Sequence, residues 1–227
     1  MADTRTGRNG RSPATRESIL AVAERLFAEH GISALSNRRI GEAAGQGNNF
    51  AVGHHFGTRA DPVRAVVRRH AEPMERRRSR MIAETRARRG GHGQVRDWVA
   101  CLVRPLTEHL EALGGPTWFA RFGAQVTTDP VPRRVVLDEA LATRPVQQVL
   151  DGLDRCLPAL PPSVRLERGD MARNLVSHVC AERERALAEG SPAHERNRHE
   201  RTWEDTAAGL IDAITGLWAA PVTTTGA

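Results

Sequence analysis

The chain has 227 residues and a net charge of +6, which suits a small domain plus a larger one and is compatible with an acidic partner. Its three cysteines, Cys101, Cys156 and Cys180, are an odd number without a CxxC pair, which argues against a disulfide framework and a zinc site. No apolar run approaches membrane-spanning length, and the N-terminus lacks the apolar segment of a signal peptide. We therefore expect a cytoplasmic protein with reduced thiols.

Residues 1–14 are polar and carry Arg5, Arg8 and Arg11. Two interpretations are compatible: a disordered tail, or a flexible basic arm that lies on the phosphates or in the minor groove of a nucleic acid.

The first predicted helix begins near residue 15 and ends at Gly31. Its apolar positions form one stripe, made of Ile19, Val22, Ala23, Leu26 and Phe27. Such a stripe predicts that the helix packs on others through one face.

The stretch 36–56, SNRRIGEAAGQGNNFAVGHHF, predicts two short helices joined by a tight turn. Ser36 is a good N-cap for the first, and Gly45 can end it in a left-handed conformation. Asn48 or Asn49 can cap the second, which continues to His55. This pattern is a helix-turn-helix, whose second helix enters the DNA major groove.

At these residues the sequence resembles the tetracycline-repressor (TetR) family of transcriptional regulators. The shared marks are the RESILAVAERLFAEHG helix, the Ser36-capped RRIGEAAG helix and the HHFGTRADPV segment, over about residues 15–65. Three features depart from the common pattern: a turn and recognition helix one residue longer, Gly53 inside that helix, and His54 in place of a tyrosine. The resemblance implies a sequence-specific DNA-binding regulator.

The candidate DNA contacts divide by chemistry. Asn48 and Asn49 could hydrogen-bond an adenine edge, whereas an apolar side chain of the same helix could meet a thymine methyl. Gly53 either permits close backbone approach or is tolerated, and the two histidines touch phosphate or pack beneath the helix. Hydroxyl and Arg side chains at the helix starts suit phosphates. The full set is Ser36, Arg38, Arg39, Asn48, Asn49, Phe50, Val52, Gly53, His54, His55, Thr58 and Arg59.

Beyond residue 61 every predicted element is a helix, so we expect an all-α fold. The fourth helix starts at Asp61-Pro62, bends before Pro73, and buries Val63, Val66, Val67, His70, Met74 and Met81. Its Arg-rich second half is interpreted as a solvated face in preference to a DNA contact. Further helices are predicted over 94–113, 116–126, 130–157 with a split at Pro145, 163–189, and a last one bearing residues 203–218.

These elements give four regions: a flexible arm (1–14), the three-helix DNA-binding domain (15–61), a larger helical effector-binding and dimerisation domain (62–220), and a loose tail (221–227). The resemblance implies a homodimer formed by the last two long helices. The sequence agrees, because the last helix has more apolar surface than one-sided burial needs, although intrachain core explains it equally well. The expected interface residues are Trp203, Leu210, Ile211, Ile214, Leu217 and Trp218.

The resemblance also implies a small-molecule pocket in the larger domain. Aromatic and Met side chains gather near one bend-rich region, which favours a pocket, although each could simply belong to the core. Arg104, Arg121 or His178 could orient an anionic group. The candidate lining residues are Met74, Trp98, Leu102, Trp118, Phe119, Phe122, Met171, Leu175 and His178.

The function predicted from these patterns is a homodimeric repressor that a small molecule releases from a palindromic operator. The chain has no GxSxG, P-loop, GxGxxG or HExxH motif, so we expect no enzymatic activity and no cofactor or metal. Two alternatives remain: a ligand-independent DNA-organising protein, and a regulator that senses oxidants through Cys101, Cys156 or Cys180. The apolar surroundings of the three cysteines argue against the second.

Overall fold

The computed structural model describes residues 13–45, 56, 58, 60–88, 93–189 and 202–222. All regular structure in these ranges is helical, which confirms the predicted all-α class. In chain order the helices are α1 (Pro13–His30), α2 (Asn37–Ala43), α4 (Asp61–Arg88), α5 (Val95–Leu113), α6 (Phe119–Thr128), α7 (Pro130–Leu141), α8 (Arg144–Cys156), α9 (Pro162–Glu189) and α11 (Trp203–Ala219).

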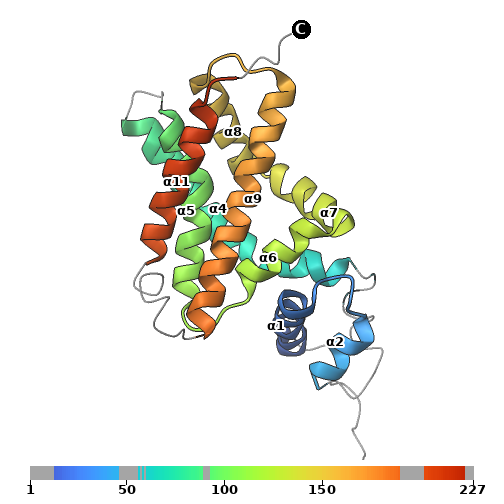
Figure 1. The fold of residues 1–227 in the computed structure, drawn as a ribbon. Helices are drawn as coiled ribbons and strands as arrows, with labels where there is room; N and C mark the ends of the chain where they lie inside the picture. Colours follow the sequence, from blue (N-terminus) through green and yellow to red (C-terminus); the bar gives the residue numbers. More distant parts are fainter. Residues whose placement is uncertain are drawn as a thin grey trace, which may run out of the picture.

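Two groups of helices are visible in Figure 1. α1 and α2 lie together at one end, whereas α5, α9 and α11 run side by side through the rest of the molecule. α4 joins the two groups, because it packs on α1 in the first group and on α5 and α8 in the second. α6 is a second connection, since it packs on both α1 and α9.

The caps explain where the first helices end. Gly31 adopts a φ of +79° after α1, and Gly45 a φ of +67° after α2, a left-handed conformation that glycine reaches without a steric penalty. The Ser36 side chain accepts a hydrogen bond from the backbone N–H of Arg39, as its prediction as an N-cap required. The α1 stripe is buried as expected, with Ile19 and Ala23 fully inaccessible.

Two predicted breaks are confirmed. Pro145 lies in the first turn of α8 and separates that helix from α7, because proline fits the first turn, where its missing N–H is not needed. Gly114 ends α5 with a φ of +62°. Pro73, by contrast, lies inside the continuous helix α4.

One buried residue contradicts the expected solvated character of the second half of α4. Arg78 is buried, and its guanidinium donates to the Cys101 carbonyl oxygen at 2.7 Å and to Glu75 at 3.1 Å. A buried guanidinium needs such acceptors, because desolvation without them would be costly. Arg78 therefore ties α4 to α5.

The centre of the larger domain is built around Trp98 of α5. Its ring lies on Gly152 of α8 so closely that a Cβ at that position would come within 2.4 Å of the indole. Glycine is thus required here by close packing, since any side chain would displace the ring. Next to it, Cys156 contacts the backbone carbonyl of Gly93 through its sulfur at 2.8 Å.

None of the helices in the described ranges is long and apolar enough to cross a membrane.

Candidate nucleic-acid interface

α2 has one buried side that packs on α1 and one exposed side with basic and polar side chains. Ile40 is buried against the α1 core, while Ser36, Arg38 and Arg39 are exposed. Arg38 forms only a loose pair with Glu42, 3.7 Å away on the exposed face, so it costs little to redirect it. These three side chains are available for the phosphate contacts predicted for them.

The predicted recognition helix falls in residues 46–55, which lie outside the described part of the chain, as do residues 57 and 59. The contact predictions that fall there therefore stay predictions; they concern Asn48, Asn49, Phe50, Val52, Gly53, His54, His55 and Arg59.

Phe56, directly after this segment, is described and anchored on α1. Phe56 is buried, and the Arg16 guanidinium lies over its ring, 5.2 Å from the centroid. The arrangement fixes the end of the helix-turn-helix segment against α1.

Thr58, predicted to contact phosphate, caps the start of α4 within the chain. Both its backbone N–H and its hydroxyl donate to the same Asp61 carboxylate oxygen, each at 2.7 Å. These hydrogen bonds lower the pKa of the Asp61 carboxyl and hold the first turn of α4. In this conformation the two donors of Thr58 cap α4, and the phosphate contact expected of Thr58 stays a prediction.

The DNA-binding unit is tied to the larger domain by several polar contacts. Ser33, in the α1–α2 connection, donates to Asp129, which also caps α7. Arg69 of α4 pairs with Glu17 of α1 at 2.7 Å. These contacts join α1 and the α1–α2 connection to α4 and α7.

The predicted effector-pocket residues do not converge on one cavity. Trp98, Phe119 and Phe122 are buried in the core, and Met74, Leu102 and Trp118 are half-buried against it. Met171 is 46% exposed on α9. Leu175 and His178 line a groove of about 530 Å³ between α9 and α11.

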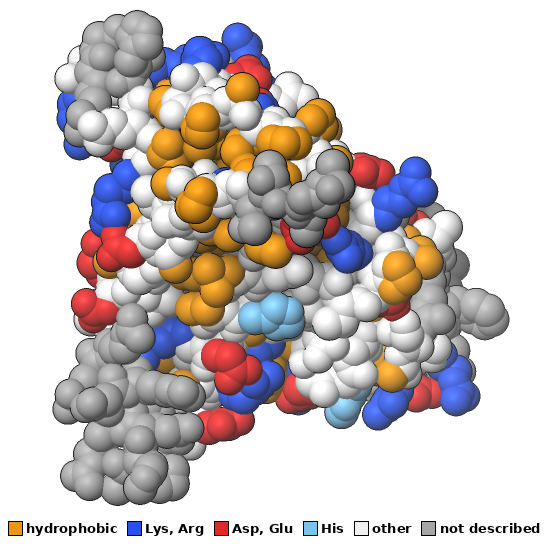
Figure 2. Space-filling model, turned by 45° about the horizontal axis from the view of Figure 1, so that its top comes forward, with side chains coloured by type: hydrophobic (Ala, Val, Ile, Leu, Met, Phe, Trp, Pro, Cys, Tyr) orange, Lys and Arg blue, Asp and Glu red, His pale blue; other side chains and the backbone are white. Residues whose placement is uncertain are grey.

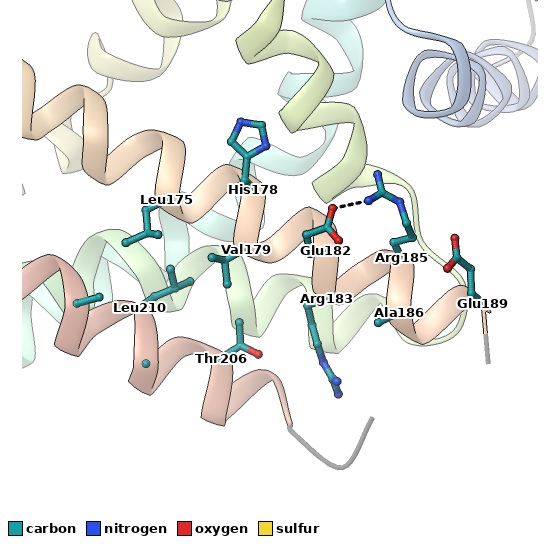
Figure 3. Close-up of a pocket in the computed structure, with 12 residues that line it drawn as sticks. Leu175, His178, Val179, Glu182, Arg183, Arg185, Ala186, Glu189, Thr206 and Leu210 are labelled. Carbon is teal, nitrogen blue, oxygen red and sulfur yellow. Dashed lines mark hydrogen bonds and ion pairs between the residues drawn. The ribbon is translucent and has the colours of Figure 1, made fainter. Parts of the chain in front are cut away.

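Two of the charged groups proposed to orient a ligand are already paired. Arg104 makes a bidentate pair with Glu204 of α11, at 2.6 and 2.7 Å, which raises the pKa of the guanidinium. Arg121 donates to Glu184 at 3.1 Å and stacks over Trp118. His178 alone of the three is among the residues that line the groove, and in Figure 3 its ring points from α9 away from α11.

The predicted dimer residues on α11 mostly face inward. Five of the six are at most 8% exposed and pack within the chain, where α11 lies along α5 and α9; they are Trp203, Leu210, Ile211, Ile214 and Trp218. Leu217 is half-buried against the same core. The single chain therefore buries this face itself, and the interpretation as intrachain core is the one that the packing supports.

The edge of α11 that includes Leu210 forms the groove together with α9. In Figure 3, Leu175 and Val179 of α9 and Leu210 and Thr206 of α11 line its floor. Figure 2 shows hydrophobic side chains gathered in a band across one face of the molecule, with charged side chains mainly toward its margins.

Two buried clusters were missed from the sequence. Glu184 is 2% exposed and accepts hydrogen bonds from the first turn of α6, and a chain of Glu24, His70 and His109 lies between α1, α4 and α5. For Glu184 a sequence signal existed, since it lies four residues after Cys180, on the same helical face as the buried Ala172 and Cys180.

Among the described residues no group of three or more His, Cys, Asp or Glu side chains is arranged to hold a metal ion.

The geometry defines a class: an all-helical protein with a small N-terminal unit whose exposed α2 carries arginines. Comparison with known proteins agrees. The family model described as "Bacterial regulatory proteins, tetR family" matches residues 19–66. The chain is 31% identical over 136 residues to the HTH-type transcriptional repressor AcnR of Corynebacterium glutamicum, and equally to its counterpart in Corynebacterium efficiens.

These alignments cover 57% of this chain and 63% of each relative's length. A crystal structure of a TetR-family regulator from Streptomyces coelicolor shares the fold, with a TM-score of 0.50 at 18% identity, over 93% of this chain and 98% of the other. Similarity to the tetR family of bacterial regulatory proteins is thus found over residues 19–66, and the Streptomyces structure shares the fold over most of the chain.

Proposed function

We propose that this chain is a sequence-specific DNA-binding transcriptional regulator that acts in the cytoplasm as a repressor, without catalysis. The observation that supports this most directly is the family match over residues 19–66, which spans α1, α2, the helix-turn-helix segment and the start of α4. The Corynebacterium proteins that resemble it are named transcriptional repressors.

The segment that we propose contacts the DNA bases is the predicted recognition helix, which begins at Asn48. Base edges are read by side chains of its helix, and Ser36, Arg38 and Arg39 hold the backbone from the exposed start of α2. Phosphate contacts give most of the affinity and make it depend on salt. Arg59 completes this set of phosphate contacts.

The proposed active form is a homodimer, because one copy of a helix-turn-helix reads too few base pairs for selectivity. We place the partner over the α9–α11 groove instead of on the inward face of α11. His178 and Ala213 are exposed there, and the exposed lining is mainly apolar. Exposed apolar surface of this kind on a groove is the usual mark of a protein interface.

A small molecule would release the operator by favouring one arrangement of the two DNA-binding units over another. α6 is the connection that fits this role, since Phe122 packs on Phe27 of α1 while the other end of α6 is held by Glu184 of α9. The half-buried Met74, Leu102 and Trp118, of which Trp118 precedes the first residue of α6, remain our candidates for the effector site.

Two single substitutions test the assignment of DNA contacts. Arg59→Ala should weaken binding to all DNA sequences alike and reduce the salt slope by about one, as loss of a phosphate contact does. Asn49→Ala should change the preference among operators, at about 1–3 kcal/mol for the contacted base pair. Both effects are measured by fluorescence anisotropy with an operator panel at several salt concentrations. If the two variants behave alike, the division of roles is wrong.

A further inference from the structure

Three titratable side chains from three helices form a buried hydrogen-bonded chain. His70 of α4 is in the middle: its Nε2 lies 3.0 Å from Glu24 Oε2 of α1, and its Nδ1 lies 2.8 Å from His109 Nε2 of α5. The exposed fractions are 7% for Glu24, 4% for His70 and 7% for His109. The chain thus links the DNA-binding unit to the core of the larger domain through groups that can gain or lose protons.

An aromatic ring of a fourth helix closes the site. Phe119 of α6 stacks on His70, with the ring centroids 3.9 Å apart and an interplanar angle of 20°. It meets His109 edge-on at 5.9 Å. The link therefore gathers α1, α4, α5 and α6 at one point.

The charged neighbours come from the same helices. On the α1 side, Arg69 lies 3.7 Å from the Glu24 carboxylate and 2.7 Å from Glu17. On the α5 side, Arg77 of α4 pairs with Glu108 at 2.9 Å and acts on His109 through its charge. One end of the chain is therefore anionic and the other is close to a cation.

The geometry limits how many protons the chain can hold. Each of the two hydrogen bonds needs one proton between its atoms. With Glu24 ionised, both bonds form if the two imidazoles are neutral, or if His70 alone is cationic and donates to His109. If both imidazoles are cationic, an N–H of His70 faces an N–H of His109 at 2.8 Å, and this bond cannot exist.

The environment of His109 opposes the second proton. Burial lowers the pKa of His109 to about 4, and the charges of His70 and Arg77 act in the same direction, against Glu24. His109 has a pKa below the ordinary 6.5 in the closed arrangement, so any arrangement that exposes its imidazole binds a proton more readily. The closed arrangement therefore loses stability relative to the open one as the pH falls through 6.5. Acidification therefore favours opening.

We propose that the Glu24–His70–His109 chain is a proton-responsive latch, which holds α1 on the larger domain while the two imidazoles carry at most one excess proton and releases it when both are protonated. The functional consequence, a position of the helix-turn-helix unit that depends on pH, rests on the DNA-binding function proposed above. The release itself does not, because it is a property of the free protein.

The test compares hydrogen–deuterium exchange of α1 and α9 in the full chain at pH 7.5 and 5.5, after correction for the intrinsic pH dependence of exchange. With the pKa of His109 moving from about 4 to 6.5 on opening, the opening equilibrium of α1 should rise about tenfold. In His109→Gln, which keeps a hydrogen-bonding side chain but does not titrate, the rise should be less than about twofold. His30→Gln, at the exposed C-terminal end of α1, should behave as the wild type.

Amides of α9 in the same samples report global unfolding. If α1 and α9 change together, or if His109→Gln retains the tenfold rise, the latch is refuted. If His109→Gln does not fold, Glu24→Gln replaces it: loss of the ionised acceptor should raise α1 exchange about tenfold already at pH 7.5, and no change there would equally refute the latch. Operator binding measured in parallel separates the two proposals, because failure to bind DNA at either pH would refute the DNA-binding function and leave the exchange result standing.

Discussion

Replacement of Glu184 by alanine is expected to lower the free energy of unfolding by about 3–5 kcal/mol, a large part of the total for a chain of this size. Glu184 is 2% exposed, and its carboxylate accepts four hydrogen bonds. The donors are the Thr117 hydroxyl at 2.7 Å, the backbone N–H groups of Ala120 and Arg121 at 3.1 and 2.9 Å, and the Arg121 side chain at 3.1 Å.

The size of the effect follows from what the substitution leaves behind. Alanine would leave the Arg121 guanidinium, whose side chain is only 10% exposed, without its carboxylate. It would also leave the N-terminal N–H groups of α6 without an acceptor, in a place where water has little access. Breaking one side of a buried pair costs more than the pair contributes, because the remaining charge stays desolvated.

Urea unfolding followed by circular dichroism measures this loss. Glu184→Gln keeps the shape of the side chain, but two of the four donors then face an amide NH₂ group, which cannot accept their hydrogen bonds. We therefore expect this variant to lose about half as much free energy of unfolding as Glu184→Ala. Glu167→Ala, an exposed position of the same helix, is the matched control and should change stability by less than about 0.5 kcal/mol. Equal stabilities for Glu184→Ala and Glu167→Ala would show that Glu184 does not hold α6.

Introduction of arginine at Ala213 is expected to give a folded monomer. Ala213 is exposed on α11 and lines the groove between α9 and α11, where we place the partner copy. A charged, bulky side chain there would be desolvated in the dimer but solvated in the free chain. In the dimer, two linked DNA-binding units contact the two halves of the operator at the same time. The affinity of the monomeric variant for the operator should therefore be about 10²–10⁴-fold lower.

Sedimentation velocity and operator titration measure the two effects. Ala140→Arg, at an exposed position of α7, controls for the added charge. Leu210→Asp provides the contrast: Leu210 is 3% exposed, so this variant should lose the fold and not merely the dimer. A dimer that survives Ala213→Arg would place the interface on another surface.

The helices could be predicted largely from local signals. Ser36, Gly31 and Gly45 act on the backbone within one turn, and Pro145 separates α7 from α8 whatever surrounds it. These effects need no knowledge of the tertiary structure. The predicted burial of His70 on α4 was likewise correct, because it follows the helical period.

Local signals could not predict which helix, or which second chain, packs on a given helix face. Helical spacing showed that Trp203 and Ile214 share an apolar face, but periodicity does not say whether a face packs on its own chain or on a second copy. Thr58 looked available for phosphate until the structure showed both its donors on Asp61. The helical spacing of Glu184 can indicate that it is buried, but not that its carboxylate accepts hydrogen bonds from the first turn of α6.

The central claim is that the chain reads DNA sequence as a dimer, and selection from random double-stranded DNA with the full-length protein tests it most directly. We expect one enriched palindromic motif, with half-sites centred about 34–36 Å or one helical turn apart, and a single footprint occupied by an even number of protomers. Recovery of no motif, with uniform coating of DNA in the footprint, would contradict the account and favour a protein that organises DNA without reading its sequence.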